Sequence, residues 1–331
     1  MEKRNKLSYS CAIIIPAVNI NNDVIKCVNK CASQYKVKVT IYLVTNKKVK
    51  YKFKSKKINF LYLGDVFMSK KRNFAVKKAK EQFIAFIDSD AYPAKRWLYN
   101  GIKLLKEKKE IGMVTGPDLP FKDQSHLTNL ISLSHRSFFL SGSKSFRKKL
   151  KKTMVCSQAS SCNMIMRKDI YIKAKGMDES IYIGEDKDLC DKFNRISKIL
   201  YSPSILIYHR TRDFIPFLLQ RFSYGTCLFD IVKNNRFLSF NNLQYFGPLL
   251  IVLYYIILPF SILFNLYNNI FYFILIFLNG AILVESLRIS LKPLKTIKIF
   301  LIIKLNIIMF GLGSIFSFIG IDYIKKIYKK R

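Results

Sequence analysis

Asp88 and Asp90 have the type and spacing needed to bind a cation. They directly follow the apolar run Phe83–Ile87. In extended backbone, residues i and i+2 point to the same side, so both carboxylates can face one site. Two carboxylates there suit a hard divalent ion, Mg²⁺ or Mn²⁺, which prefers oxygen ligands and shares them with substrate phosphates. The alternative is an ordinary Asp-rich turn, ended by Pro93.

A second acidic cluster follows Gly184 and opens a predicted helix that continues through Phe193. Its members are Glu185, Asp186 and Asp188. Acids in a first helical turn are favoured by the helix dipole and by free N–H groups, which accounts for one or two of them. Helix capping does not require three acids after a glycine in a chain with only 21 Asp and Glu residues. The cluster is therefore a second candidate for chemistry.

His209 is the third candidate, and it ends the strand-rich segment Lys198–Tyr208. The chain has only three histidines. A histidine just beyond a strand can ligate a metal or a phosphate, and the alternative is a purely structural histidine. The sequence by itself leaves both roles open.

Alternating strands and helices position these residues. The β-branched run Ala12–Ile15, ended by Pro16, predicts a strand buried on both faces. The other predicted elements are strands at Val37–Val44, Ile58–Leu63 and Phe83–Ile87 and helices at Asp23–Ser33 and Ser69–Lys80. This order predicts an α/β fold with a mainly parallel sheet covered by helices. Ligands of such sheets bind beyond the carboxyl ends of the strands, where Asp88 and Asp90 stand.

The C-terminal part of this 331-residue chain differs in kind from the rest. Residues 241–284 contain no charged side chain, although 24% of the chain is charged. A membrane-spanning helix needs about 20 mainly apolar residues, so 246–264 and 266–284 are predicted spans, with a very apolar soluble hairpin as the alternative. A third apolar run, 299–321, contains Lys304 and either spans or lies at the interface. Basic residues on both sides of this run favour two spans plus an interfacial segment, and three spans stay open.

These features predict a three-part organisation. Residues 1–212 form a cytoplasmic catalytic domain, 213–240 form amphipathic interfacial helices, and 241–331 form the membrane domain. A helix packed under the sheet is the alternative for the middle segment. The expected location is the cell membrane, as a multi-pass protein in contact with membrane lipids.

The net charge of +36 first suggests a nucleic-acid-binding protein. That class explains neither the uncharged stretch nor the acids at a strand end and a helix start, so no nucleic-acid partner is expected. A transporter is disfavoured because the predicted spans carry no acid except Glu285 at an edge. A catalytically inactive scaffold of a polysaccharide-assembly complex is the remaining alternative.

The ordered set of motifs resembles the family 2 glycosyltransferases with a GT-A fold, of the bacterial membrane-anchored type. The likeness covers roughly residues 10 to 235, and it consists of the AIIIP strand, the RN helix, FIAFIDSDAYP, GPDLP, SCNMIMRKD, GMDE, GEDKDLC and YH. Each piece alone is common, and the strength of the resemblance lies in their order and spacing.

The resemblance implies a role for each matching position. It implies that Asp88 faces the nucleotide ribose, that Asp90 and His209 bind the metal, and that Asp186 is the catalytic base with Glu185 beside it. The remaining implied donor-binding residues are Pro16, Arg72, Asn73 and Asn163. Ser161 and Cys162 border the donor sugar and the acceptor, and Gln220 and Arg221 lie in the region that faces the acceptor.

The family pattern is incomplete at two places. Thr45 and Asn46 stand where family members often have acids that hold the base, so the base stays open among uracil, guanine and thymine. The QxxRW signature of processive synthases is absent, which favours a transferase that adds one sugar. The expected reaction is metal-dependent transfer, with inversion, from a nucleotide-diphosphate sugar to a lipid-linked saccharide or polyprenyl phosphate near the membrane. Its expected role is in the assembly of a cell-surface polysaccharide or glycolipid.

Overall fold

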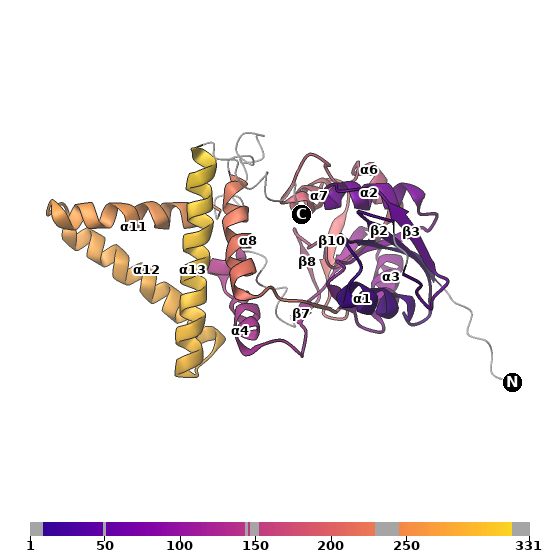
Figure 1. Ribbon diagram of the computed structural model, residues 1–331, viewed down its shortest axis with the longest axis horizontal. Coiled ribbons are helices and arrows are strands. Elements are labelled where there is room, and N and C mark those ends of the chain that lie inside the picture. Colours follow the sequence, from indigo (N-terminus) through magenta and orange to yellow (C-terminus); the bar gives the residue numbers. More distant parts are fainter. Residues whose placement is uncertain (1–8, 49–50, 143–144, 146–151, 229–244, 320–331) are drawn as a thin grey trace. The chain divides into compact units, whose positions relative to one another are not determined.

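The computed structural model describes residues 9–48, 51–142, 145, 152–228 and 245–319 (Figure 1). The chain divides into two compact units. The first comprises Met1–Phe121 and Lys149–Arg210, and the second comprises Lys122–Lys148 and Thr211–Arg331. The sequence predicts a first domain of residues 1–212 and gives no sign that 122–148 group with the C-terminal helices.

An eight-stranded sheet forms the centre of the first unit, in the order β3-β2-β1-β4-β9-β6-β10-β8. Strands β1, β2, β3, β4, β6 and β10 run in one direction, and β9 and β8 run in the other. The prediction of an α/β fold with a mainly parallel sheet is therefore confirmed. The strand bounds are β1 Tyr9–Pro16, β2 Val37–Thr45, β3 Ile58–Tyr62, β4 Phe83–Phe86, β6 Ile111–Thr115, β8 Met154–Cys156, β9 Met164–Arg167 and β10 Lys198–Tyr201.

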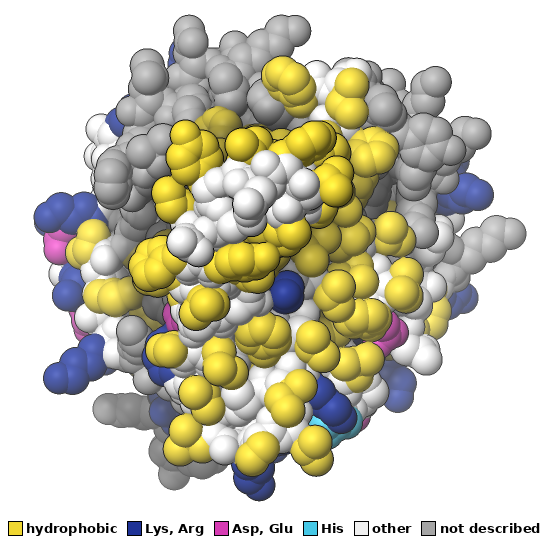
Figure 2. All heavy atoms as spheres, turned by 90° about the vertical axis from the view of Figure 1, so that its left-hand side faces the viewer, with side chains coloured by type: hydrophobic (Ala, Val, Ile, Leu, Met, Phe, Trp, Pro, Cys, Tyr) yellow, Lys and Arg dark blue, Asp and Glu magenta, His cyan; other side chains and the backbone are white. Residues whose placement is uncertain are grey.

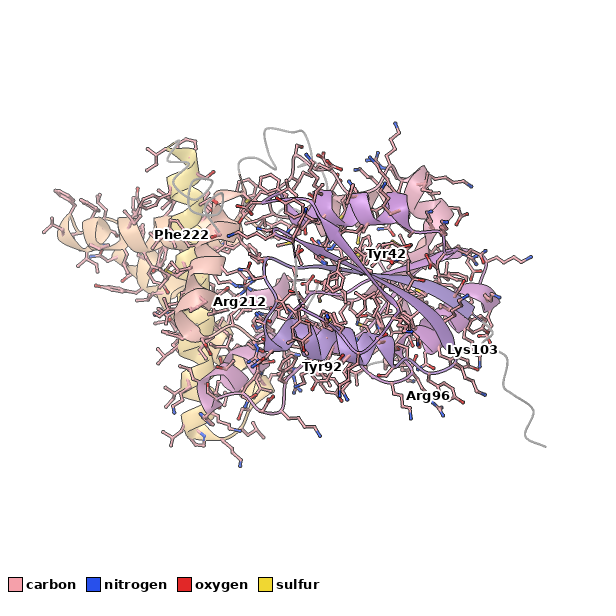
Figure 3. The ribbon with its side chains drawn as sticks, turned by 45° about the vertical axis from the view of Figure 1, so that its right-hand side comes forward. Tyr42, Tyr92, Arg96, Lys103, Arg212 and Phe222 are labelled. Carbon is pink, nitrogen blue, oxygen red and sulfur yellow. The ribbon has the colours of Figure 1, made fainter. Side chains whose placement is uncertain are left out.

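Helices cover both faces of this sheet, and the alternation of side chains along β1 explains how. Cys11, Ile13 and Ile15 pack in one core with α1 (Asn22–Ala32) and α3 (Trp97–Glu107). The opposite face receives α2 (Met68–Lys78), where the Tyr42 hydroxyl of β2 donates to the Lys78 carbonyl at 3.3 Å (Figure 3). The remaining helices of this unit are α6 (Lys168–Lys173) and α7 (Glu185–Asn194).

The start and the buried face of α1 follow from its sequence. The Asn21 side chain accepts a hydrogen bond from the Val24 N–H at 3.0 Å, which satisfies one of the free donors of the first turn. Val24, Val28 and Cys31 recur at helical spacing and are buried against the sheet, as the sequence predicts. This cap fixes the start of α1 at Asn22, shortly after the end of β1.

A three-stranded sheet, in the order β5-β11-β7, joins segments that lie far apart in the sequence. Its strands are β5 (Ala91–Pro93), β7 (Asp118–Pro120) and β11 (Ile207–His209). In this sheet β11 pairs with β5 antiparallel and with β7 in parallel. The turn before β7 needs glycine, because a Cβ at Gly116 would lie 2.1 Å from the Ile205 carbonyl oxygen.

The described part of the second unit is helical, and its long helix α13 (Pro293–Phe318) packs closely against α8 (Phe214–Thr226). Two glycines permit this approach. A Cβ at Gly225 would lie 2.0 Å from the Phe310 carbonyl oxygen, and one at Gly313 would lie 2.1 Å from that of Phe222. The other helices among the described residues of this unit are α4 (His126–Ser134), α5 (Phe138–Ser141), α11 (Gly247–Leu263) and α12 (Asn268–Ile289).

Two described helices, α12 and α13, are long and apolar enough to cross a membrane. They differ in burial, since 11% of the most apolar window of α12 is buried within the structure against 44% for α13. Helix α11, in the first predicted span, is shorter. Figure 2 shows hydrophobic side chains spread over the face that these helices form.

The structure describes only parts of two predicted segments. Within 213–240, α8 packs along α13, and residues 229–240 lie outside the described residues. The third apolar run is predicted at 299–321, but its helix begins earlier, at Pro293. Proline is well tolerated in a first helical turn, because its missing N–H would have no partner there. Residues 320–321 lie outside the described part.

Candidate active site

Asp88, Asp90 and His209 come together beyond the carboxyl end of β4. The His209 Nε2 atom lies 3.2 Å from Asp90 Oδ1 and 3.9 Å from Asp88 Oδ2. One potential ligand atom from each of the three residues lies within 4.8 Å of the other two. Their side chains are 26–41% exposed, so solvent reaches the cluster.

Strand pairing explains why a histidine so distant in sequence joins the two aspartates. His209 ends β11, and its register partner in β5 is Ala91, the residue directly after Asp90. The Arg210 N–H also donates to the Asp90 carbonyl at 3.0 Å. The two backbones are therefore held together independently of any attraction between the side chains.

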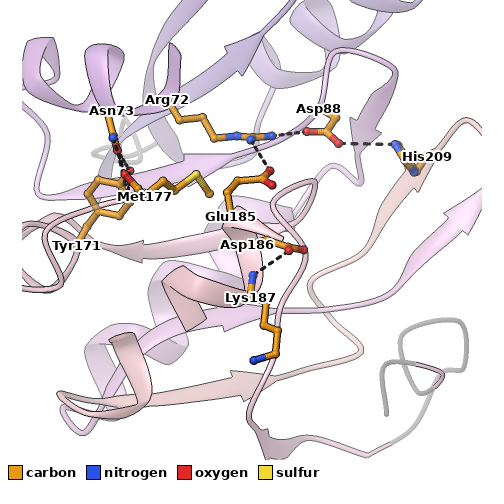
Figure 4. Close-up of polar contacts among 9 residues, drawn as sticks. All are labelled: Arg72, Asn73, Asp88, Tyr171, Met177, Glu185, Asp186, Lys187 and His209. Carbon is orange, nitrogen blue, oxygen red and sulfur yellow. Dashed lines mark hydrogen bonds and ion pairs between the residues drawn. The ribbon is translucent and has the colours of Figure 1, made fainter. Parts of the chain in front are cut away.

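Arg72 connects this cluster to the start of α7. Its Nη2 atom lies 2.7 Å from Asp88 Oδ1, and its Nη1 atom lies 3.5 Å from Glu185 Oε1 (Figure 4). Only 2% of its side chain is exposed, and the guanidinium lies 5.8 Å from the centre of the Phe86 ring. A buried guanidinium in a fixed position is a strong partner for carboxylates and for phosphates.

The acids of α7 divide into two groups. Glu185 faces Arg72, and Asp186 lies beside it with Oδ1 accepting the Lys187 N–H at 2.8 Å (Figure 4). Asp188 instead forms an ion pair with Lys192 at 2.7 Å, one turn along the same helix. Gly184 precedes them with φ of +95°, a conformation that favours glycine. This turn sets the two acids at the beginning of the helix, with Glu185 next to Arg72.

Burial and the close approach of several carboxylates shift the pKa values of Glu185 and His209. Burial, followed by the adjacent charge of Asp186, raises the pKa of Glu185 to about 7. Burial alone would lower the pKa of His209. The charge and hydrogen bond of Asp90, with the charges of Asp88 and Asp118, outweigh it, so this pKa lies above its ordinary value. The site therefore favours cations and protons, as expected where several acids converge.

We expect Glu185→Gln to flatten the pH dependence of stability. A raised carboxyl pKa means that the folded state holds its proton more tightly than the unfolded state. The contribution of Glu185 is thus complete below the ordinary value of 4.5 and is lost as pH rises through about 7. As pH rises from about 5 to about 8, the free energy of unfolding should fall less in the variant than in the wild type. The difference between the two decreases is on the order of 2 kcal/mol.

Thermal unfolding monitored by circular dichroism at several pH values measures this difference. Glu107→Gln is the matched control, because Glu107 is 53% exposed in a surface pair with Lys103. Parallel pH profiles for the wild type and Glu185→Gln would contradict the assignment.

Comparison with known families identifies the fold that carries these residues. Residues 12–174 match the family model described as glycosyl transferase family 2. These residues form a family 2 glycosyltransferase domain. The match includes Arg72, Asp88 and Asp90 and ends before Glu185 and His209. A search of curated proteins found no significant match.

Solved structures that are similar to this chain share low sequence identity with it. Residues 1–349 of S. aureus TarS in complex with UDP align with a TM-score of 0.44 and 14% identity over 64% of this chain. GalNAc-T7 with UDP, GalNAc and Mn²⁺ gives 0.43 and 14% over 62%, and another S. aureus TarS structure gives 0.44 and 16% over 72%. This chain spans 63%, 44% and 45% of their respective lengths.

The ligand atoms that the cluster offers suit a divalent cation. Asp88 and Asp90 offer carboxylate oxygens and His209 offers an imidazole nitrogen, while solvent has access for water ligands. Mg²⁺ and Mn²⁺ bind through few protein ligands and complete their shells with water and phosphate oxygens. These three residues would hold the cation.

Asn73, a predicted donor-binding residue of the family 2 domain, does not join the cluster. Its amide nitrogen donates to the Met177 carbonyl at 2.8 Å and to Glu179 Oε1 at 2.9 Å. Its amide oxygen accepts the Met177 N–H at 3.1 Å and the Tyr171 hydroxyl (Figure 4). Both ends of the amide thus hold the loop that precedes α7.

Asn163 is also a predicted donor-binding residue, and it lies inside the core with 2% of it exposed. Its amide oxygen accepts the Trp97 Nε1–H at 2.8 Å, and its nitrogen donates to the Ile205 carbonyl at 2.9 Å. Both amide groups are therefore bonded to the protein. The residue connects α3 with the segment before β11.

The other predicted residues lie in three different places. Pro16 ends β1 at the same edge of the sheet as Asp88, and Ser161 and Cys162 are buried before β9. Gln220 and Arg221 belong to the second unit. There the Arg221 guanidinium donates to Gln220 Oε1 at 3.1 Å and lies 4.9 Å from the Tyr224 ring centre.

Lys71 is a structural residue near the ends of β1 and β2 that the sequence does not predict. It is fully buried, and its ammonium donates to the Ala17 carbonyl at 2.8 Å and to the amide oxygen of Asn46. It thereby ties together the segments that follow β1 and β2. Burial lowers its pKa to about 8. Among 57 Lys and Arg residues, no sequence signal distinguishes it from solvated lysines.

Proposed function

We propose that the chain is an inverting, metal-dependent glycosyltransferase that uses a nucleotide-diphosphate sugar as donor. The single observation that carries this proposal is the cluster of Asp88, Asp90 and His209, linked through Arg72 to Glu185 at the start of α7. It joins a cation-binding set with the start of α7, where the candidate base Asp186 follows Glu185. The family 2 domain supports the same reaction class.

The proposed reaction assigns distinct tasks to the two parts of the site. Asp88, Asp90 and His209 would hold the cation, which would supply positive charge to the leaving diphosphate. Arg72 keeps Asp88 and Glu185 in fixed positions and adds positive charge beside them.

Asp186 acts as the general base. It takes the proton of the acceptor hydroxyl while the hydroxyl oxygen forms its bond to the anomeric carbon. The bond between that carbon and the diphosphate oxygen breaks on the opposite face, so the configuration inverts. The electron pair of the broken bond leaves with the diphosphate.

The proposed acceptor is a lipid-linked saccharide or a polyprenyl phosphate at the cell membrane, with the catalytic domain in the cytoplasm. Support comes from the second unit, where many large apolar side chains of α11 and α12 are exposed, including Leu263, Phe273 and Ile276. Exposed apolar surface of this extent is typical of contact with lipid. We place the product in polysaccharide or glycolipid assembly.

A screen of nucleotide-sugars tests the proposal. Detergent-purified full-length protein is incubated with UDP-, GDP- and dTDP-sugars with Mg²⁺, with Mn²⁺ and with a chelator, and release of the nucleoside diphosphate is measured. We expect metal-dependent hydrolysis of one donor class, because water can replace the acceptor slowly. Binding of a donor without turnover, even with membrane lipid extracts added, would favour the inactive scaffold instead.

A further inference from the structure

A second group of side chains lies on the buried side of His209. Asp118, Cys162 and His209 each offer an atom that lies within 4.8 Å of those of the other two. Only 5% of Asp118 and 3% of Cys162 are exposed, whereas 41% of the Asp90 side chain is exposed. The imidazole is thus shared between an exposed pair of carboxylates and one buried carboxylate.

The small sheet fixes Asp118 beside the histidine. In the parallel pair of β7 and β11, Asp118 is the register partner of Ile207, two residues before His209. Side chains two residues apart on a strand point to the same face, so Asp118 and His209 share one face of the sheet. Their proximity follows from backbone pairing and does not depend on a chance rotamer.

The two nitrogens of the imidazole require different partners if His209 is to bind a cation. Nε2 is the atom that faces Asp90, at 3.2 Å. A neutral imidazole presents a lone pair at Nε2 only when its proton sits on Nδ1. Histidine ligands commonly secure that tautomer by donating the Nδ1–H to a carboxylate or a carbonyl group. The same hydrogen bond stabilises the buried carboxylate, because a buried charge needs hydrogen-bond donors.

We propose that Asp118 is a positioning residue that accepts the Nδ1–H of His209 and so aims the Nε2 lone pair at the cation held with Asp88 and Asp90. This inference rests on the proposed function, and it adds a residue outside the acidic pair and the α7 acids. Asp118 does not touch the cation or the substrate, and it acts only through the ring of His209.

Mn²⁺ affinity tests the inference without relying on turnover. Electron paramagnetic resonance of free Mn²⁺ gives the dissociation constant for full-length protein with saturating UDP, GDP or dTDP. We expect Asp118→Leu to weaken Mn²⁺ binding about 10- to 100-fold, the usual cost of losing such a partner. Asp118→Asn, which keeps an acceptor oxygen but loses the charge, should give a smaller loss. Ile207→Val is the matched control, since Ile207 is the register partner of Asp118 and the change disturbs packing in the same sheet while leaving the carboxylate.

A double variant separates positioning from a general structural effect. In a His209→Ala background, Asp118→Leu should weaken Mn²⁺ binding no further, because the residue through which it acts is gone. Equal losses in both backgrounds, or wild-type affinity in Asp118→Leu, would overturn the inference and leave the proposed function standing. A wild-type protein that binds no Mn²⁺ with any of the three nucleotides would overturn the metal part of the proposed function as well.

Discussion

Asp186→Asn is expected to lower glycosyl transfer by about 10²–10⁴-fold, which is the usual contribution of a general base. The amide of asparagine cannot take the proton of the acceptor hydroxyl, yet it is nearly the same size as the carboxylate. The backbone of α7 should be undisturbed, because the asparagine oxygen can still accept the Lys187 N–H that Asp186 accepts at 2.8 Å. Transfer is measured as radiolabelled sugar moved to lipid acceptor, with the donor identified by the nucleotide-sugar screen.

A measurement of nucleotide binding distinguishes loss of the general base from loss of donor binding. Isothermal titration with the nucleoside diphosphate and Mn²⁺ should give similar affinity for Asp186→Asn and the wild type. Asp191→Asn is the matched control on the same helix, since Asp191 is 50% exposed and pairs with Lys187 one turn away. Turnover of Asp186→Asn close to that of the control would show that another group takes the proton.

Asp90→Asn is expected to reduce transfer by about 10²–10³-fold at a fixed low Mn²⁺ concentration, the equivalent of several kcal/mol of charge stabilisation. Asp90 Oδ1 lies 3.2 Å from His209 Nε2, so the substitution removes a charged oxygen from the centre of the proposed cation site. Unlike Asp186→Asn, this variant should lose the dependence of nucleotide affinity on metal. The measurement is transfer rate and nucleotide affinity across a Mn²⁺ titration.

Recovery at high Mn²⁺ distinguishes weakened cation binding from misfolding. Asp90→Asn should regain part of its activity as Mn²⁺ rises, because the amide oxygen remains a weak ligand. Asp169→Asn, an exposed acid in the first turn of α6, should show the wild-type curve. Metal stimulation unchanged in Asp90→Asn would remove this residue from the proposed site.

The local pattern of the sequence determined the strands and helices of the first unit as far as β4. Ala12–Ile15 lies within β1, Val37–Val44 within β2, and Phe83–Ile87 covers β4. A fully buried strand requires a continuous apolar run, and such runs are legible in a single sequence. The position of Asp88 and Asp90 after β4 follows from the same signal, because carboxyl ends of parallel strands meet at one edge of the sheet.

The tertiary structure alone decided which distant residues meet. Strand β9 enters the centre of the sheet antiparallel to both neighbours, and β11 brings His209 to Asp90 and Asp118. Asn73 and Asn163 match the family motif, yet their amides bond to the protein's own loops. Periodicity and residue type are local properties of the chain. Pairing between segments depends on the energies of all competing pairings at once, and a single sequence does not display those energies.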